Sequence, residues 1–412
     1  MTEAGIISGA KPKMAMWFRY GPTENAKLFV ALPDILSALA ETMEVHYYGF
    51  RGAGDGDLSW APHVHFHIIP LRINRASNSS KLFYSILWFL FLPFIAIHCR
   101  MTGIRVIYVD DAVPFLGFWP RLICGPKVAL TVGDLLIETY GSCLGGLRPV
   151  VGLFQNWEAR TWRSMGVIFV RSKSAVSILH EKYGVPVQKM VPVYDACDFG
   201  MFKPGDQLEA RQKIGLVPAS AFLICYHGVL HPNKGLAAVL VAMAPLLKAR
   251  PDVHFVIIGN GLEYERLTRI TGDRELASQV HFTGYMEPAR VATFIHASDV
   301  GLVCRAGGTT DNLVVTSVLG RYMASRVAVL AARVSGIAEV VADGVNGALY
   351  DPRSPEEFLE KLTLLVESRE TRKRLAEAGY CTAQQVFDKK NTAGKTVTAV
   401  LEMVRKPTAT GL

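Results

Sequence analysis

Short apolar segments alternate with amphipathic segments through the second half of the chain, and glycine-containing turns follow the apolar ones. The apolar segments cover residues 222–226, 253–258, 280–282, 300–303 and 327–331. Continuous apolar runs of this length are typical of strands buried on both faces. Strands that alternate with helices predict a doubly wound parallel α/β sheet. The glycine turns then lie at the carboxyl ends of the strands, where such sheets bind their ligands.

The first of these turns, residues 228–235, reads Gly-Val-Leu-His-Pro-Asn-Lys-Gly and places Lys234 just before a predicted helix. Backbone N–H groups of such a loop and of a helix N-terminus point at a bound anion, and an ammonium group adds a full charge. The turn is not a Walker A loop, because the G-x-x-x-x-G-K-[ST] pattern is absent. An ordinary strand-to-helix turn with a solvated lysine is the alternative, and the pattern leaves both open.

Length and composition limit the classes of protein that this chain can belong to. At 412 residues, it is longer than one core normally supports, so we expect two domains of about 200 residues each. Seven scattered cysteines without a C-x-x-C pair favour reduced thiols in the cytoplasm. The net charge of +8 suits anionic substrates or an anionic membrane surface, whereas no basic run suggests nucleic acid. The histidines show no metal-ligand spacing, so we expect no bound metal and no cofactor.

The apolar segment 82–97 allows three interpretations. It is slightly shorter than a membrane-spanning helix, and Pro93 is expected to break it. A buried helix of the first domain, a membrane span and a helix lying on the membrane surface all remain open. Basic residues flank the segment at Arg72, Arg75, Lys81, Arg100 and Arg105. The start of the chain lacks a signal-peptide pattern. We therefore expect a cytoplasmic protein with peripheral membrane contact through residues 82–97.

Motifs in the second half resemble, in order, those of retaining glycosyltransferases of family 4, the glycosyl transferases group 1. They lie at residues 228–235, 257–261, 282–284, 297–299, 322–324 and 336–341. The first half is similar more weakly, at residues 166–172 and at a junction pattern formed by Asp198, Phe202 and Pro204. The resemblance implies the GT-B fold, in which two Rossmann-like domains face a cleft. It implies an acceptor-side domain over residues 1–200, a nucleotide-sugar domain over 201–384, and a return of residues 385–412 to the first domain.

The resemblance also implies an activity and a set of site residues. The expected reaction moves a sugar, with retention of configuration, from a UDP- or GDP-linked donor to a glycan or a lipid-linked acceptor in polysaccharide or glycolipid synthesis. Lys234 matches the family's lysine that contacts the diphosphate, and Asp134 and Asp311 are the other catalytic candidates. Each of these two aspartates is also consistent with an ordinary turn residue. The donor-binding candidates are Gly228, His231, Gly259, Asn260, Gly261, Tyr285, Met286, Arg305, Thr309, Thr310, Asn312, Thr316, Ser317 and Arg321. Thr316 and Ser317 are also suited to capping a helix.

The chain departs from the family in its E-x(7)-E motif. The two glutamates of that motif align with Leu313 and Arg321, and an arginine cannot accept hydrogen bonds from a ribose. Val229 stands where many members carry an arginine. Two alternatives therefore remain: a GT-B binding or scaffold subunit with reduced catalysis, and a GT-B sugar-nucleotide epimerase. A dehydrogenase is disfavoured, because the Gly-Asn-Gly turn at 259–261 lacks the third glycine of the dinucleotide motif.

Overall fold

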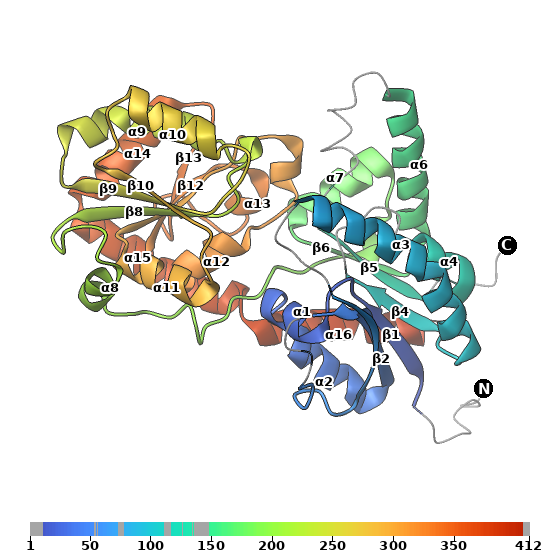
Figure 1. Ribbon diagram of the computed structural model, residues 1–412. Helices are drawn as coiled ribbons and strands as arrows, with labels where there is room; N and C mark the ends of the chain where they lie inside the picture. Colours follow the sequence, from blue (N-terminus) through green and yellow to red (C-terminus); the bar gives the residue numbers. More distant parts are fainter. Residues whose placement is uncertain are drawn as a thin grey trace. The chain divides into compact units, whose positions relative to one another are not determined.

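The computed structural model describes residues 11–52, 55, 57–72, 78–110, 117–125, 127–133, 135 and 148–406. They form two compact units (Figure 1). The first contains the described residues of Met1–Arg171, with Ala175–Val193 and Lys389–Leu412, and the second contains Ser172–Ser174 and Tyr194–Asp388. The chain thus passes to the second unit at Tyr194 and returns to the first at Lys389.

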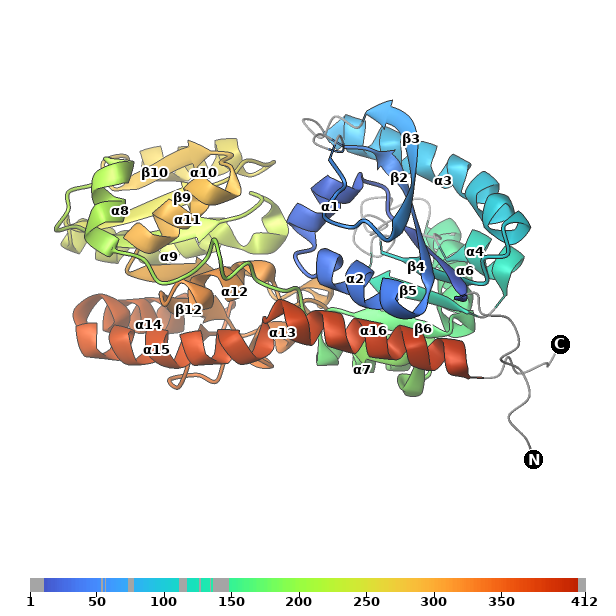
Figure 2. The ribbon, with the colours of Figure 1, turned by 90° about the horizontal axis from the view of Figure 1, so that it is seen from below.

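The first unit is built on a seven-stranded parallel sheet in the order β3-β2-β1-β4-β5-β6-β7. Its strands are β1 (Lys13–Trp17), β2 (Glu44–Arg51), β3 (Val64–Arg72), β4 (Val106–Val109), β5 (Val128–Val132), β6 (Val167–Val170) and β7 (Met190–Pro192). Its helices are α1 (Pro22–Leu28), α2 (Leu32–Thr42), α3 (Asn78–Met101), α4 (Phe118–Cys124), α6 (Arg148–Ser164), α7 (Lys173–Tyr183) and α16 (Lys389–Arg405). Helices α3, α4 and α6 lie on one side of this sheet, and α2 and α16 lie on the other (Figures 1 and 2). Both faces are therefore covered, as the apolar strands require.

Helix α3 continues through Pro93 as a single helix, so the expectation that this proline breaks it is wrong. A proline removes one backbone hydrogen bond, and packing on a sheet can hold the helix together across that gap. One face of α3 is buried at Trp88, Leu92 and Cys99. The Trp88 ring lies 5.3 Å from the ring of Phe50 on β2, measured between centroids.

The last helix of the chain, α16, belongs to the first unit (Figure 2). It packs on α2 and β6. Lys389 forms an ion pair with Asp34 at 3.1 Å, and the ammonium of Lys127 donates to the Val404 carbonyl at 2.8 Å. Helix α15, which directly precedes α16, packs in the second unit.

The second unit contains a six-stranded parallel sheet in the order β10-β9-β8-β11-β12-β13. Its strands are β8 (Phe222–His227), β9 (Val253–Ile258), β10 (Val280–Gly284), β11 (Val300–Val303), β12 (Ala328–Ala332) and β13 (Ala348–Tyr350). Its helices are α8 (Gln207–Ile214), α9 (Leu236–Ala249), α10 (Tyr264–Asp273), α11 (Pro288–Ala297), α12 (Ser317–Ala324), α13 (Ser335–Ala338), α14 (Pro355–Glu367) and α15 (Arg369–Val386). Helices α9, α10 and α14 cover one face, and α8, α11, α12 and α15 cover the other (Figure 1). This is the doubly wound sheet that the sequence predicts.

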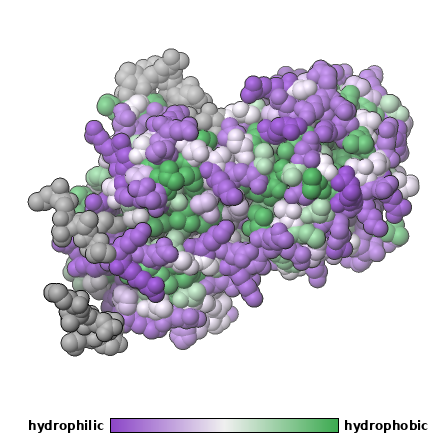
Figure 3. Space-filling model, turned by 180° about the vertical axis from the view of Figure 1, so that it is seen from behind, coloured by the Kyte–Doolittle hydropathy of each residue, from purple (hydrophilic) through white to green (hydrophobic). Residues whose placement is uncertain are grey.

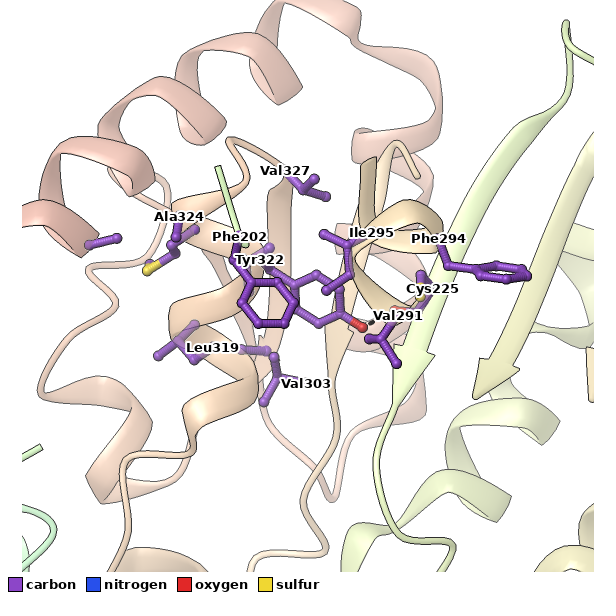
Figure 4. Close-up of a cluster of buried hydrophobic side chains, with 14 of the residues drawn as sticks. Phe202, Cys225, Val291, Phe294, Ile295, Val303, Leu319, Tyr322, Ala324 and Val327 are labelled. Atoms are coloured by element: carbon purple, nitrogen blue, oxygen red, sulfur yellow. Dashed lines mark hydrogen bonds between the residues drawn. The ribbon is translucent and has the colours of Figure 1, made fainter. Parts of the chain in front are cut away.

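Each strand of this sheet contributes to two cores because successive side chains point to opposite faces. On β8, Leu223 and Cys225 join the core beneath α11 and α12, while Ile224 and Tyr226 join the core beneath α9. Figure 4 shows the first of these cores. There the buried Tyr322 hydroxyl donates to the Cys225 carbonyl at 2.7 Å. Seen from behind, hydrophilic side chains cover much of the surface of each unit, and smaller hydrophobic patches lie among these side chains (Figure 3).

Candidate functional site

Three loops at the carboxyl edge of the second sheet are joined through their backbones. The N–H of Gly228 donates to Ile258 at 3.0 Å, the N–H of Leu230 donates to Asn260 at 3.0 Å, and the N–H of Gly259 donates to Gly284 at 2.8 Å. These bonds connect the loop after β8 to the end of β9 and to the loop after β9, and they connect that loop to Gly284 at the end of β10. The loop after β11 joins the loop after β8 through the N–H of Ala306, which donates to the Asn233 carbonyl at 2.9 Å. We call residues 228–235, 259–263 and 304–312 the strand-end loops. Backbone pairing of this kind fixes their N–H groups at the edge where doubly wound sheets bind ligands.

Two glycines make this close approach possible. A Cβ added at Gly259 would lie 1.9 Å from the carbonyl oxygen of Gly228, and one added at Gly261 would lie 2.1 Å from the carbonyl oxygen of Leu230. Gly259 also has a φ of +141°, a backbone conformation that L side chains rarely adopt. The two glycines of this turn are therefore required because the backbone of the loop after β9 packs closely against the backbone of the loop after β8.

Lys234 lies in a short 3-10 turn, η3 (Pro232–Lys234), between the end of β8 and the start of α9. The side chain of His231 accepts from the N–H of Asn233 at 3.3 Å, and Gly235 turns the chain into the helix with a φ of +68°. The carbonyl of Asn233 accepts from the N–H of Ala306 at 2.9 Å, which attaches this turn to the loop after β11. Lys234 is partly buried at the N-terminus of α9, in the place that the sequence predicts for it.

The carboxylate of Asp311 points into its own loop. It is 4% exposed, and its Oδ2 accepts from the N–H groups of Gly307 and Gly308, both at 3.1 Å. A guanidinium nitrogen of Arg305 lies 3.9 Å from its Oδ1. Asp311 therefore organises the turn η4 (Thr309–Asn312), which also contains Thr309 and Thr310.

Other donor candidates also make local contacts within the second unit. The side-chain oxygen of Asn312 accepts from the N–H of Ser335 at 2.8 Å. Thr316 is the N-cap of α12, where its hydroxyl accepts from the N–H of Val318 at 3.4 Å, and Ser317 is the first residue of that helix. This is the capping role that the sequence left open. Tyr285 is 71% exposed after β10, and Met286 beside it packs partly against the core.

In this region His227 is buried and Arg321 is partly buried. The guanidinium of Arg321, on α12, lies over the ring of Phe202 at 5.1 Å. Burial lowers the pKa of the His227 imidazole to about 3, and the charge of Arg321 adds to this effect. His227 is therefore neutral at physiological pH, and Arg321 carries the positive charge.

Sequence reasoning assigned no role to Glu339, although it lies within the motif at 336–341. Its carboxylate accepts from the N–H groups of Lys173 and Ser174 at 2.7 and 2.5 Å, and from the hydroxyl of Tyr194 at 3.1 Å. All four residues belong to the second unit, which includes the first two residues of α7. The signal in the sequence was the position of Glu339 in a predicted ligand-binding loop. Its hydrogen-bond partners are far away in sequence, so only the tertiary structure identifies them.

In the first unit, Asp134 lies outside the described residues. The neighbouring strand β4 leads into Asp110, whose carboxylate accepts from the hydroxyl of Tyr108 at 3.2 Å and pairs with Arg171 at 3.4 Å. Among the described residues, no group of three or more His, Cys, Asp or Glu side chains is arranged to hold a metal ion.

One protein-family model matches part of the chain. Residues 207–382 match the family model described as Glycosyl transferases group 1. The chain is 29% identical over 209 residues to a D-inositol 3-phosphate glycosyltransferase of Segniliparus rotundus, covering 50% of this chain and 45% of that protein. It is 28% identical over 272 residues to the protein of the same name from Acidothermus cellulolyticus, covering 64% of this chain and 56% of the other. The chain thus spans about half the length of these curated relatives.

Solved structures match nearly the whole chain at low sequence identity. A structure of Anabaena HepE with UDP matches with a TM-score of 0.69 and 17% identity, covering 95% of this chain and 100% of HepE. Sucrose-phosphate synthase from Thermosynechococcus elongatus matches with a TM-score of 0.75 and 16% identity, covering 96% and 99%. At this identity the likeness establishes the fold. The chain therefore has the predicted GT-B fold, and its residues 207–382 match the family model of the glycosyl transferases group 1.

Proposed function

We propose that the chain is a glycosyltransferase that uses a nucleotide sugar, bound at the strand-end loops of the second unit. The observation that carries the proposal is the backbone pairing of these loops around the turn that holds Lys234. The group 1 family match over the same unit supports it. Further support comes from HepE, which has been crystallised with UDP and with UDP-glucose. We propose UDP- or GDP-linked sugars as the donor class.

Transfer breaks the bond between the anomeric carbon and the diphosphate oxygen, and the electron pair leaves with the nucleoside diphosphate. An acceptor hydroxyl forms the new bond to that carbon and loses its proton. The protein assists most by holding positive charge and N–H dipoles where the leaving charge develops. Lys234 supplies that charge in our proposal, and the N-terminus of α9 supplies N–H groups.

Retention of configuration and the acceptor class follow from the family resemblance, and we include both in the proposal. The acceptor is a glycan or a lipid-linked glycan of a polysaccharide or glycolipid pathway. Asp134 is the proposed group that orients the acceptor hydroxyl. Proton NMR of the fresh product distinguishes retention from inversion through the coupling constant of the new anomeric proton.

A binding or scaffold subunit is the second candidate, and specific observations favour it. The two glutamate positions of the family motif hold Leu313 and Arg321, and the nearby carboxylate of Asp311 is bound to its own turn. A scaffold subunit would bind partners or donor without turnover. A sugar-nucleotide epimerase would convert the donor sugar without releasing nucleotide.

Donor binding and turnover test the proposal. Thermal-shift measurements with UDP- and GDP-sugars should show stabilisation by one nucleotide class, and nucleotide release should follow when an acceptor is present. Lys234→Ala should slow release by about 30- to 1,000-fold, which corresponds to a barrier increase of about 2–4 kcal/mol. Lys248→Ala is the matched control, because Lys248 lies at the exposed end of α9. Wild-type turnover in Lys234→Ala would refute the assignment. Stabilisation without release would favour a scaffold.

We also propose that the first unit docks on a membrane through α3. Within the described residues, α3 contains the one helix segment long and apolar enough to cross a bilayer, Phe83–Met101. Its exposed large apolar residues recur every three or four positions, which places them on one stripe. They are Phe83, Ile86, Leu90, Phe94, Ile97 and Met101.

The opposite face of α3 is buried against its own sheet, as Trp88 and Leu92 show. A helix held along one face by its own sheet is suited to lie in the plane of the membrane surface. Arg100 and Arg105 are exposed at its C-terminal end and suit anionic head groups. Cys99, Cys197, Cys225, Cys304 and Cys381 are free, which agrees with the cytoplasmic face.

Vesicle sedimentation tests this docking. Wild-type protein should pellet with vesicles that contain anionic phosphatidylglycerol, and high salt or alkaline carbonate should release it. Phe94→Glu should abolish pelleting, because it places a charge at a side chain that is 69% exposed in the stripe. Leu364→Glu, at an exposed position of α14, is the control and should pellet normally. Retention under carbonate would indicate a membrane span, and absence of binding at every salt concentration would refute docking.

A further inference from the structure

Arg321 is a partly buried cation that has no acidic partner in the described part of the chain. Among the residues that the structure describes, its guanidinium has no ion pair and no hydrogen bond, and it lies over the ring of Phe202 at 5.1 Å. Burial lowers the pKa of this guanidinium, which shows that its surroundings disfavour the charge. Charged groups that leave water are normally paired, because an unpaired buried charge costs several kcal/mol.

His227, the last residue of β8, is a second polar group without a partner beside Arg321. The residue is 5% exposed, and its Nε2 has no hydrogen-bond partner within the described part of the chain. Its ring stands edge-on to the ring of Tyr322, the residue next to Arg321, with 5.2 Å between centroids. Most buried side-chain polar atoms have a partner, so a lone ring nitrogen here requires an explanation.

Both observations are explained by one missing group. A neutral imidazole can donate one hydrogen bond through Nε2, and a guanidinium offers several donors and a full charge. Neither residue needs another donor or another cation. The group that completes both is an oxyanion, and phosphates and carboxylates suit guanidinium well.

We propose that Arg321 and His227 form a subsite for an oxyanion of the substrate, a phosphate or a carboxylate. The inference rests on the proposed function, since it places this subsite at the donor-binding edge of the second unit. It also deepens that function. Where the aligned family motif has its second glutamate, this chain has Arg321, which contacts a negative group of the donor. The chain therefore selects a different ligand chemistry at that position.

The subsite predicts which ligands stabilise the protein. In thermal-shift and calorimetric titrations at constant ionic strength, pyrophosphate should bind the wild-type protein. Arg321→Gln should weaken that binding by about 10- to 100-fold, since hydrogen bonds to charged groups are the stronger ones. Arg290→Gln is the matched control, because it removes the same charge from an exposed position of α11 in the same unit.

Two ligand pairs distinguish the possible oxyanions. If the group is a phosphate, the affinity for UDP should depend on Arg321, whereas the affinity for uridine should not. If the group is a carboxylate on the sugar, the affinity for UDP-glucuronate should depend on Arg321. UDP-glucose should then bind the wild-type protein and Arg321→Gln with equal affinity. Equal affinity of both proteins for pyrophosphate, UDP and UDP-glucuronate would overturn the inference.

A purely structural role of Arg321 gives a different signature. If stacking on Phe202 were its purpose, Arg321→Gln would lower the melting temperature of the ligand-free protein and leave the response to anions intact. The subsite predicts an unchanged or higher melting temperature without ligand, because the unpaired buried charge is gone. In ¹⁵N NMR, anion binding should also raise the pKa of His227, and Arg321→Gln should remove most of that change.

The inference and the proposed function can fail separately. Binding of pyrophosphate that depends on Arg321, in a protein that no nucleotide sugar stabilises, would support the subsite and refute the donor proposal. Nucleotide-sugar turnover that Arg321→Gln leaves unchanged would support the function and refute the subsite.

Discussion

Replacement of Gly261 by alanine should destabilise the second unit through its backbone. The added Cβ would lie 2.1 Å from the carbonyl oxygen of Leu230 and 2.8 Å from its nitrogen, whereas real Cβ contacts essentially never fall under 3.0 Å. A side chain could rotate away from such a contact, but a loop backbone must move as a whole. The β8 loop therefore has to separate from the β9 loop.

The cost of this separation follows from the bonds that join the loops. The N–H of Leu230 donates to Asn260 at 3.0 Å, and the N–H of Glu263 donates to Leu230 at 3.1 Å. Each bond contributes about 0.5–1.5 kcal/mol, and a buried donor left without a partner costs about 1–3 kcal/mol. Loss of both should lower the free energy of unfolding by about 2–4 kcal/mol. For a domain of this size, that corresponds to roughly 4–16 °C in melting temperature.

Urea unfolding monitored by circular dichroism measures this loss. Gly272→Ala is the control, because nothing lies within 4 Å of a Cβ added there, in α10. The control should be neutral or more stable by about 0.5–1 kcal/mol, as expected for alanine in a helix. Gly261→Ala should also lose the thermal response to donor nucleotides. If the free energy of unfolding of Gly261→Ala lay within about 0.5 kcal/mol of the wild-type value, close backbone packing would be refuted as the reason for this glycine.

Three further predictions concern single side chains. Burial lowers the pKa of His67 to about 4 in the folded state. Its contribution to the free energy of unfolding is therefore present above about pH 6.5 and is lost as the pH falls towards 4. His67→Gln should reduce the fall in the free energy of unfolding between pH 7 and 5 by about 1–3 kcal/mol. Tyr322→Phe removes the buried hydrogen bond to Cys225 and should lower the unfolding free energy by about 1–2 kcal/mol, and an unchanged urea midpoint would contradict this. Glu339→Gln replaces a charged acceptor of the Ser174 N–H and should cost about 1–3 kcal/mol, with calorimetry as the measurement and Glu360→Gln as the exposed control.

The strands of the second unit were predictable because their signal is local. Segments 253–258 and 300–303 form β9 and β11 with the predicted bounds, since buried parallel strands need continuous apolar runs. Strand β13, Ala348–Tyr350, was missed, because three residues carry too little pattern to distinguish a strand from a loop. Pro93 was misjudged because a local rule for proline does not include the packing of α3 on its sheet.

The sequence by itself determined the fold class, the alternation of strands and helices, and the edge of the second sheet at which the glycine loops gather. These features depend on residues close together in the chain. Only the tertiary structure decided what each side chain at that edge contacts. It directs the Asp311 carboxylate into its own loop and pairs Glu339 with the N–H groups of Lys173 and Ser174. It also places Arg321 over Phe202, with no acidic partner among the described residues. The contacts of Glu339 and Arg321 join residues far apart in sequence. They arise from the packing of whole elements, which no local pattern encodes.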